Sequence, residues 1–308
     1  MIASIFNKTR PFNYVIIGTL LLIVFVLYSF SHVTFSGWQG FLYGVLYFIA
    51  ITASCLLVNF IALKNTLTRN NNYAILLFFI FLLFFPSIFK NKNILIANFL
   101  LLLSLRRLIS LKSMKNTKEK LFDASFWIFL AALFHFWSIL YVILVFISII
   151  LHVSRDYKNW IIPGIALFSV TILFFIFNII SDNALLEDIF NKSYVSFDFT
   201  YFENAYQNIA LAVFSSIGFL FFINMIMTLS SKPMNMKTSH KKIIFSFLLG
   251  LAIYLISADK NNSCLIFSLA PLAIMGANFM ENQENKIIKE GTFYILSLLG
   301  ILFFVSQL

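Results

Sequence analysis

Long apolar runs follow one another along almost the entire chain and are separated by short polar segments. A helix of about 20 predominantly apolar residues is enough to cross the hydrocarbon core of a bilayer. The pattern therefore predicts an all-α protein, a polytopic transmembrane helical bundle of about eleven helices. A lipid-spanning β-barrel would instead show strands of alternating hydropathy. The predicted helices cover residues 13–31, 41–63, 73–89, 94–111, 122–135, 137–153, 160–180, 205–229, 243–257, 264–279 and 292–307.

The region 122–153 is too long for a single membrane crossing. One straight helix over these 32 residues would be about 48 Å long, whereas the hydrocarbon core is about 30 Å thick. A short helical hairpin that turns near His135 and Trp137 removes this mismatch. It places 18 Lys and Arg residues on one side of the membrane and 4 on the other, against 12 and 10 for a single pass. Because basic loops are retained in the cytoplasm, we expect the hairpin, an inside N-terminus and an outside C-terminus.

The composition agrees with a membrane protein and argues against several other classes. The chain of 308 residues is 61% hydrophobic and 11% charged, and its formal net charge is +10. Cytoplasmic basic loops account for that charge, so we do not expect a nucleic-acid partner. Cys55 and Cys264 lie in apolar runs, where a free thiol packs as a small hydrophobic group. No paired-cysteine, zinc, nucleotide-binding or serine-hydrolase motif occurs, so we expect neither a metal nor a cofactor.

Two loops stand out from what we interpret as a single integral membrane domain over residues 1–308. The inside loop between residues 106 and 120 is basic, whereas 181–204, the largest periplasmic loop, is acidic and aromatic. Paired outer acids suit a general base or a metal ligand acting on a periplasmic substrate. A solvated cap on the membrane surface is the alternative. The candidate catalytic residues are Asp182, Glu187 and Asp188 in this loop and Asp259 in a later outer loop.

Basic residues at the membrane boundary are the candidates for binding a lipid or a phosphate group. Arg106 and Arg107 end an apolar run, and Lys112 follows them. A guanidinium group can bind phosphate through two parallel hydrogen bonds, and clustered cations attract anionic lipids. Snorkelling of the side chains to the headgroups is the alternative explanation. Lys260 is the corresponding candidate on the outer side.

Two polar residues of the predicted hairpin are also candidates. Asp123 lies near the start of the first hairpin helix, where the positive end of the helix macrodipole favours a carboxylate. It could also pair with Arg106 or Arg107, or coordinate a lipid headgroup. His135 lies at the predicted outer turn, where a histidine either packs or changes its charge near neutral pH.

The order of these features resembles the GT-C superfamily of glycosyltransferases, which use polyprenyl-phosphate-linked sugars. The likeness rests on the basic loop before the hairpin KLFDASFWIFLAALFHFWSILYVIL, the long outer loop, and the late segment DKNNSCLIFSLAPLAIMGAN. The chain departs from the family in its first outer loop, SHVTFSGWQG, which lacks the family's catalytic carboxylate. Either an outer acid such as Asp182 or Glu187 takes that role, or the chain binds without reacting. The Phe-, Ile- and Asn-rich composition also looks like that of uncharacterised inner-membrane proteins of Bacteroidota.

Three functions follow from these observations. The resemblance implies a GT-C-like protein of the bacterial inner membrane that handles lipid-linked sugars in envelope glycan or glycoprotein assembly. The absence of catalytic motifs favours a non-catalytic integral subunit of a secretion or motility complex. A transporter is less favoured, because few charges lie mid-membrane. The expected partners are membrane lipids, a polyprenyl-phosphate-linked substrate and integral membrane proteins.

Overall fold

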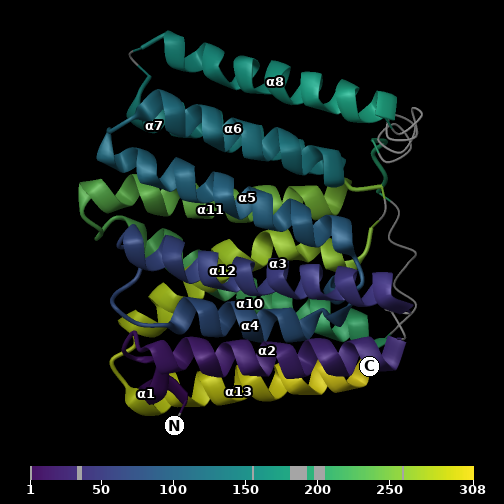
Figure 1. The fold of residues 1–308 in the computed structure, drawn as a ribbon. Helices are drawn as coiled ribbons and strands as arrows, with labels where there is room; N and C mark the ends of the chain where they lie inside the picture. The colour runs from purple at the N-terminus through teal and green to yellow at the C-terminus, as the bar shows by residue number, and fades with distance from the viewer. Residues whose placement is uncertain (1, 33–36, 155, 181–192, 198–204, 259) are drawn as a thin grey trace.

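Every regular element in the described part of the chain is a helix (Figure 1). The computed structural model describes residues 2–32, 37–154, 156–180, 193–197, 205–258 and 260–308. The predicted all-α class is therefore confirmed for these residues. Each apolar run predicted to be a helix coincides with an α-helix or with a 3₁₀ turn next to one.

The described α-helices are joined mostly by short connections, and 3₁₀ turns flank several of them. The α-helices are α1 (Ile2–Phe6), α2 (Pro11–His32), α3 (Gly37–Lys64), α4 (Tyr73–Phe84), α5 (Lys92–Ser110), α6 (Thr117–Phe134), α7 (Val142–His152), α8 (Lys158–Ile180), α10 (Ala205–Leu229), α11 (Met234–Ile256), α12 (Ile266–Asn282) and α13 (Lys286–Ser306). The 3₁₀ turns are η1 (Pro86–Phe89), η2 (Leu111–Ser113), η3 (Phe136–Tyr141) and η4 (Asn262–Leu265).

Eight helices in the described residues are long and apolar enough to cross a membrane. They are α2, α3, α5, α8, α10, α11, α12 and α13. The α4 helix and the continuous η3–α7 segment are apolar but shorter, and α6 begins with a charged first turn. The helices lie side by side, and their connections alternate between two ends of the bundle (Figure 1).

The α4 helix lies at the centre of the bundle because its sequence has no polar face. All 12 of its residues, YAILLFFIFLLF, are buried. A helix that is apolar all round needs apolar neighbours on every side. It packs against α3, α12 and α13. Within Asn262–Asn282, which contains α12, 94% of the residues in the most apolar stretch are themselves buried. Edge-to-face ring contacts complete the packing: Phe81 and Phe85 with Phe214, and Phe84 with Phe303.

Helices α11 and α12 approach each other closely at Gly250. A Cβ atom at this position would lie 2.8 Å from the backbone carbonyl of Phe267, far inside van der Waals contact. Tyr141 of η3 lies at the same crossing. Its hydroxyl donates to the carbonyl oxygen of Phe267 at 3.1 Å and lies 3.2 Å from Oγ of Ser246. The 3₁₀ turn is thereby tied to both helices.

The predicted hairpin turns at His135. Helix α6 ends at Phe134, and His135 has an extended backbone with φ −142° and ψ 103°. The chain then continues through η3 into α7. Helix α6 packs against α5 and α8, whereas α7 packs against α11. Two short helices therefore occupy the region that is too long for one.

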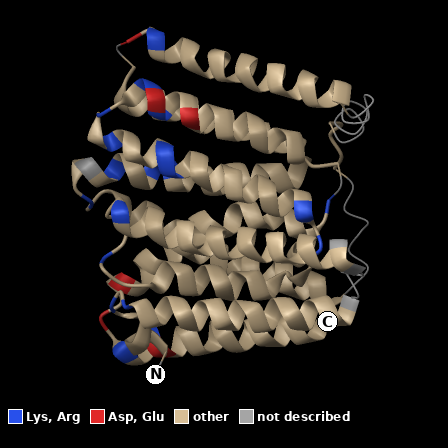
Figure 2. Cartoon of the chain, viewed as in Figure 1, with Lys and Arg blue, Asp and Glu red and all other residues tan. Residues whose placement is uncertain are grey.

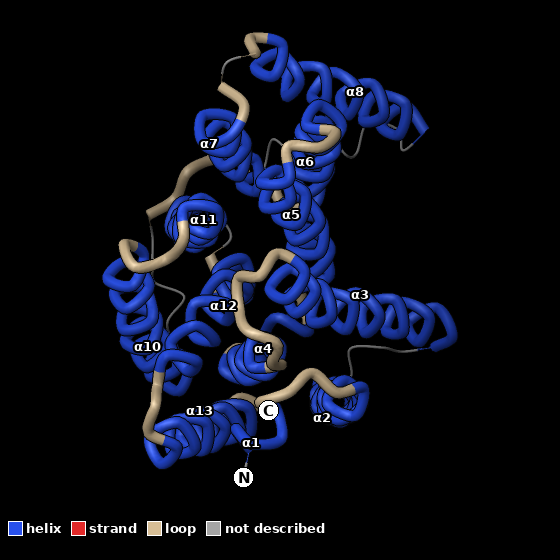
Figure 3. Tube along the Cα trace, turned by 90° about the vertical axis from the view of Figure 1, so that its left-hand side faces the viewer, coloured by secondary structure: helices blue, strands red, loops and turns tan. Residues whose placement is uncertain are grey.

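Charged side chains gather at the two ends of the bundle, and most lie at one of them (Figure 2). We call this the basic end. It contains α1 and the connections α3–α4, α5–α6, α7–α8, α10–α11 and α12–α13, and it faces the viewer in Figure 3. Among the described residues, every Lys and Arg lies at or near this end except Lys90, Lys92 and Lys260.

Replacing Gly250 by alanine is expected to destabilise the protein by about 1–3 kcal/mol, because the added methyl group must push two helix backbones apart. The matched control is Gly164→Ala in α8, where nothing lies within 4 Å of the added Cβ. There, alanine should leave stability unchanged or slightly raise it. Thermal unfolding of the detergent-purified protein measures both variants. Equal unfolding temperatures for Gly250→Ala and the unmodified protein would contradict the close approach.

Candidate functional site

The loop between α3 and α4, residues 65–72, closes the centre of the basic end. Its sequence NTLTRNNN is polar, yet most of its residues are buried. The carboxylate of Glu281 in α12 accepts the backbone N–H of Arg69 at 2.8 Å and Nδ2 of Asn71 at 2.6 Å. The backbone N–H of Asn72 donates to a carbonyl of α1 at 2.9 Å. The loop is therefore held in place by α12 on one side and by α1 on the other.

Three lysine side chains at the basic end cap the C-termini of helices. The last carbonyl groups of a helix have no partner within it, and cations are stabilising there. Two lysines donate to carbonyls of the last turn of α5, and a third donates to the carbonyl that follows α3. The pairs are Lys120 with Ser110, Lys242 with Leu108, and Lys112 with Asn65. Lys112, a predicted phosphate-binding residue, is therefore engaged within the protein.

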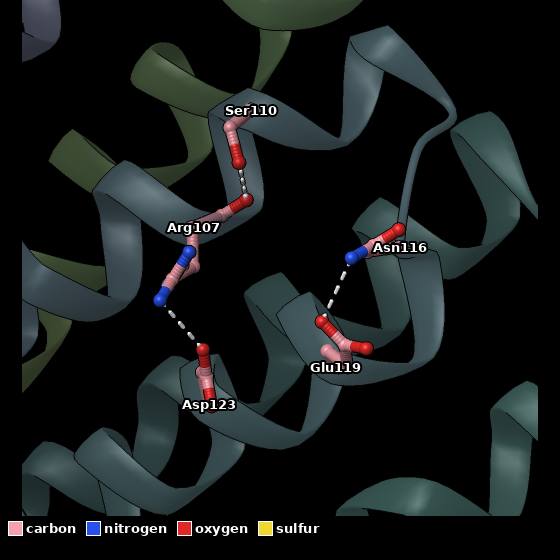
Figure 4. Close-up of polar contacts among 5 residues, drawn as sticks. All are labelled: Arg107, Ser110, Asn116, Glu119 and Asp123. Carbon is pink, nitrogen blue, oxygen red and sulfur yellow. Dashed lines mark hydrogen bonds and ion pairs between the residues drawn. The ribbon is translucent and has the colours of Figure 1, made fainter.

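Arg107 is paired with Asp123, which connects α5 to α6 (Figure 4). The distance from Nη2 of Arg107 to Oδ2 of Asp123 is 2.9 Å. The pairing with an arginine, one of the roles expected for Asp123, is present in the structure. In the neighbouring turn, Nδ2 of Asn116 donates to Oε2 of Glu119 at 3.0 Å. The charge of Arg107 is thus balanced by a carboxylate in a partly exposed ion pair.

Arg106 and Lys64 each lie close to the ring of Phe60. The Cζ atom of Arg106 lies 4.6 Å from the ring centroid, and Nζ of Lys64 lies 5.1 Å from it. Lys64 follows Phe60 by one turn of α3, so the two side chains share a face, whereas Arg106 comes from α5. Attraction to the π face of the ring positions both cations. Neither forms an ion pair within the described part of the chain.

These two cations line a cavity of about 660 Å³ between α2, α3 and α5, which we call the Arg106 groove. Lys64 is the last residue of α3, and Arg106 lies near the end of α5, so both stand at the side nearest the basic end. Tyr14 and Asn59 add two uncharged polar groups. The apolar part of the lining, besides Phe60, consists of Ala53, Leu56, Leu57, Leu63, Phe99 and Leu103. The volume falls in the range of about 300–1,000 Å³ usual for ligand sites.

Other predicted site residues lie away from this groove. Lys260 is at the opposite end of the bundle, where its Nζ donates to the carbonyl oxygen of Ser196 and lies 5.5 Å from the ring centroid of Phe197. The ring of His135 packs against that of Phe267, with their centroids 5.3 Å apart. Among the described candidates, Lys260 and His135 therefore do not share a site with Arg106.

The four catalytic candidates, Asp182, Glu187, Asp188 and Asp259, lie outside the described residues. Most of the acidic loop 181–204 lies outside them as well. Within the described ranges, no group of three His, Cys, Asp or Glu side chains could hold a metal ion.

Arg106 is the one lining residue that was predicted as a site residue, and four others on which the site depends were not. Phe60 and Lys64 carry a usable signal, because an aromatic residue one turn before a cation at the end of an apolar helix places the two side chains together. Tyr14 and Asn59 carry none. They are separated by 45 positions, and they meet only through the packing of α2 against α3.

Replacing Glu281 by alanine is expected to release the α3–α4 loop, because a buried donor that loses its acceptor costs about 1–3 kcal/mol. The measurement is the rate at which trypsin cleaves after the exposed Arg69, followed by mass spectrometry of the peptides. We expect this rate to rise by about fivefold or more. Glu284→Ala, an exposed acid in the next connection, is the control and should leave it unchanged. An unchanged rate in Glu281→Ala would contradict the anchoring role.

No family model, curated protein or solved structure matches this chain. The fold and the groove are therefore interpreted from the residues of this chain alone. The eight long apolar helices found among the described residues indicate a multi-pass membrane protein.

Proposed function

We propose that this protein binds the phosphate group of a membrane lipid in the Arg106 groove. The proposal is carried by two cations, Arg106 and Lys64, that each lie near Phe60 and line the same cavity, whose walls are otherwise mainly apolar. Guanidinium and ammonium groups form charge-assisted hydrogen bonds to phosphate oxygens. The apolar walls suit the hydrocarbon chains of the same molecule.

The dimensions of the groove suit a lipid of one leaflet. Its lining along α3 runs from Ala53 to Lys64, and these residues are separated by about 17 Å along the helix axis. That length is about half of a hydrocarbon core of about 30 Å. The lipid phosphate would lie beside Arg106, with its chains directed along Leu56 and Phe99 toward the middle of the membrane.

The orientation of the protein is part of the proposal. The concentration of described cations at the basic end supports a cytoplasmic location for that end. The chain then crosses the membrane eleven times, with its N-terminus inside and its C-terminus outside. In a bacterial cell the Arg106 groove would open to the cytoplasmic leaflet of the inner membrane.

The class of lipid follows from the same proposal. A phospholipid and a polyprenyl-phosphate-linked sugar both offer a phosphate joined to a long hydrocarbon chain. The resemblance to GT-C proteins favours the second and points to envelope glycan or glycoprotein assembly. The alternative role, a non-catalytic subunit of an envelope complex, is compatible with the same lipid site. That role stays a prediction.

Binding of phosphatidylglycerol to the full-length protein in detergent, measured by native mass spectrometry, tests the proposal. The double variant Arg106→Ala/Lys64→Ala is expected to weaken binding by about tenfold or more. The reason is that hydrogen bonds to charged groups contribute about 1.5–3 kcal/mol each.

The control for this experiment is Lys115→Ala/Lys286→Ala. It removes the same charge from exposed positions at the basic end that do not line the groove. Affinity in this control should stay within about twofold of the unmodified protein, because exposed charges act weakly and are screened by salt. Equal weakening in both double variants, or in neither, would contradict a site at Arg106 and Lys64.

A further inference from the structure

A second polar pair lines the Arg106 groove, and phosphate binding alone does not explain it. Asn59 is only 1% exposed. Its Nδ2 donates to the hydroxyl of Tyr14 at 2.7 Å and to Oδ1 of Asn72 at 3.2 Å. Its own Oδ1 is buried and has no hydrogen-bond partner among the described residues. Native proteins leave few buried polar atoms unpaired, so this acceptor calls for a donor.

Tyr14 supplies the complementary group. Its hydroxyl oxygen accepts the hydrogen bond from Asn59, so its proton is directed elsewhere. No described acceptor takes that proton, and the side chain lines the same cavity as Asn59. Tyr14 and Asn59 both line the cavity, so together they offer one donor, the Tyr14 O–H, and one acceptor, the buried Oδ1 of Asn59.

A ligand hydroxyl matches this pair, because a hydroxyl group donates one hydrogen bond and accepts others. An ionised phosphate only accepts hydrogen bonds, and a hydrocarbon chain does neither. The depth of the pair places the matching hydroxyl near the phosphate. Asn59 and Arg106 each lie within about two turns of the end of their helices, and Asn59 directly precedes Phe60.

We propose that the lipid bound in the Arg106 groove carries a hydroxylated headgroup, a polyol joined to its phosphate. Asn59 accepts the proton of one headgroup hydroxyl, and Tyr14 donates to the same oxygen. This inference rests on the proposed binding of a lipid phosphate at Arg106 and Lys64. The inference adds the chemical class of the headgroup, which Arg106 and Lys64 do not distinguish because they bind only the phosphate.

The test compares two lipids of equal charge and identical acyl chains. Phosphatidylglycerol has free hydroxyls in its headgroup, and phosphatidylmethanol has none. Native mass spectrometry of the full-length protein should show a preference for phosphatidylglycerol of about threefold to tenfold, the value of one net hydrogen bond of about 1 kcal/mol. Asn59→Leu should abolish the preference while binding to phosphatidylmethanol persists. Tyr14→Phe removes the hydroxyl of a partly exposed side chain. This variant should also reduce the preference, and it serves as an independent test if Asn59→Leu fails to fold.

The matched control is Asn98→Leu, which removes another asparagine of 2% exposure that does not line the groove. The preference should survive this substitution. Equal affinity of the unmodified protein for the two lipids, or a preference that persists in Asn59→Leu and Tyr14→Phe, would overturn the headgroup assignment. Binding of both lipids would then still depend on Arg106. Loss of that dependence would overturn the proposed function itself.

A competition experiment distinguishes a lipid ligand from a soluble phosphoester. Glycerol 1-phosphate carries the same headgroup hydroxyls on a phosphate monoester and has no hydrocarbon chains. At millimolar concentration it should fail to displace phosphatidylglycerol, because the apolar walls contribute through chain burial. Displacement at a concentration comparable to that of the lipid would overturn a lipid headgroup as the ligand.

Discussion

A charged side chain cannot keep its hydration inside the hydrocarbon core, and Arg or Lys at the centre of a membrane helix costs about 2.5–3.5 kcal/mol on insertion scales. This constraint organises the whole chain. Apolar runs form helices because the backbone must satisfy its own hydrogen bonds in lipid. The described charges then collect at the two ends of the bundle. Helix α4 has no polar face at all, so neighbouring helices cover it on every side.

The same constraint explains how the cations of the basic end are used. Lys242 is fully buried, and its Nζ donates to a carbonyl that α5 leaves free at its C-terminus. Arg107 is balanced by Asp123. Successive residues of a helix point about 100° apart, so Arg106 faces α3 and Phe60 instead. Two adjacent arginines therefore differ in their contacts: Arg107 connects α5 to α6, and Arg106 lines the groove in which we propose that a lipid phosphate binds.

Most of the helical architecture could be predicted from the sequence, because each helix is marked by an apolar run of its own. The turn at His135 could also be predicted, from the excess length of one run and the balance of basic residues. The pairing of Arg107 with Asp123 was one of several alternatives, since sequence spacing does not decide which helices become neighbours. The groove could not be predicted from the sequence for the same reason. It depends on Tyr14, Asn59 and Arg106, which three different helices bring together.

The cytoplasmic location of the basic end is the claim on which the lipid site depends. The chain's own cysteines, Cys55 and Cys264, are buried, so a single introduced cysteine can report the accessibility of each end. The direct measurement is labelling of Lys115→Cys and Lys90→Cys with a membrane-impermeant maleimide in intact spheroplasts. We expect Lys90→Cys to react at once and Lys115→Cys to react only after the membrane is permeabilised. Reaction of Lys115→Cys in intact spheroplasts would contradict the orientation, and so would equal reaction of the two positions.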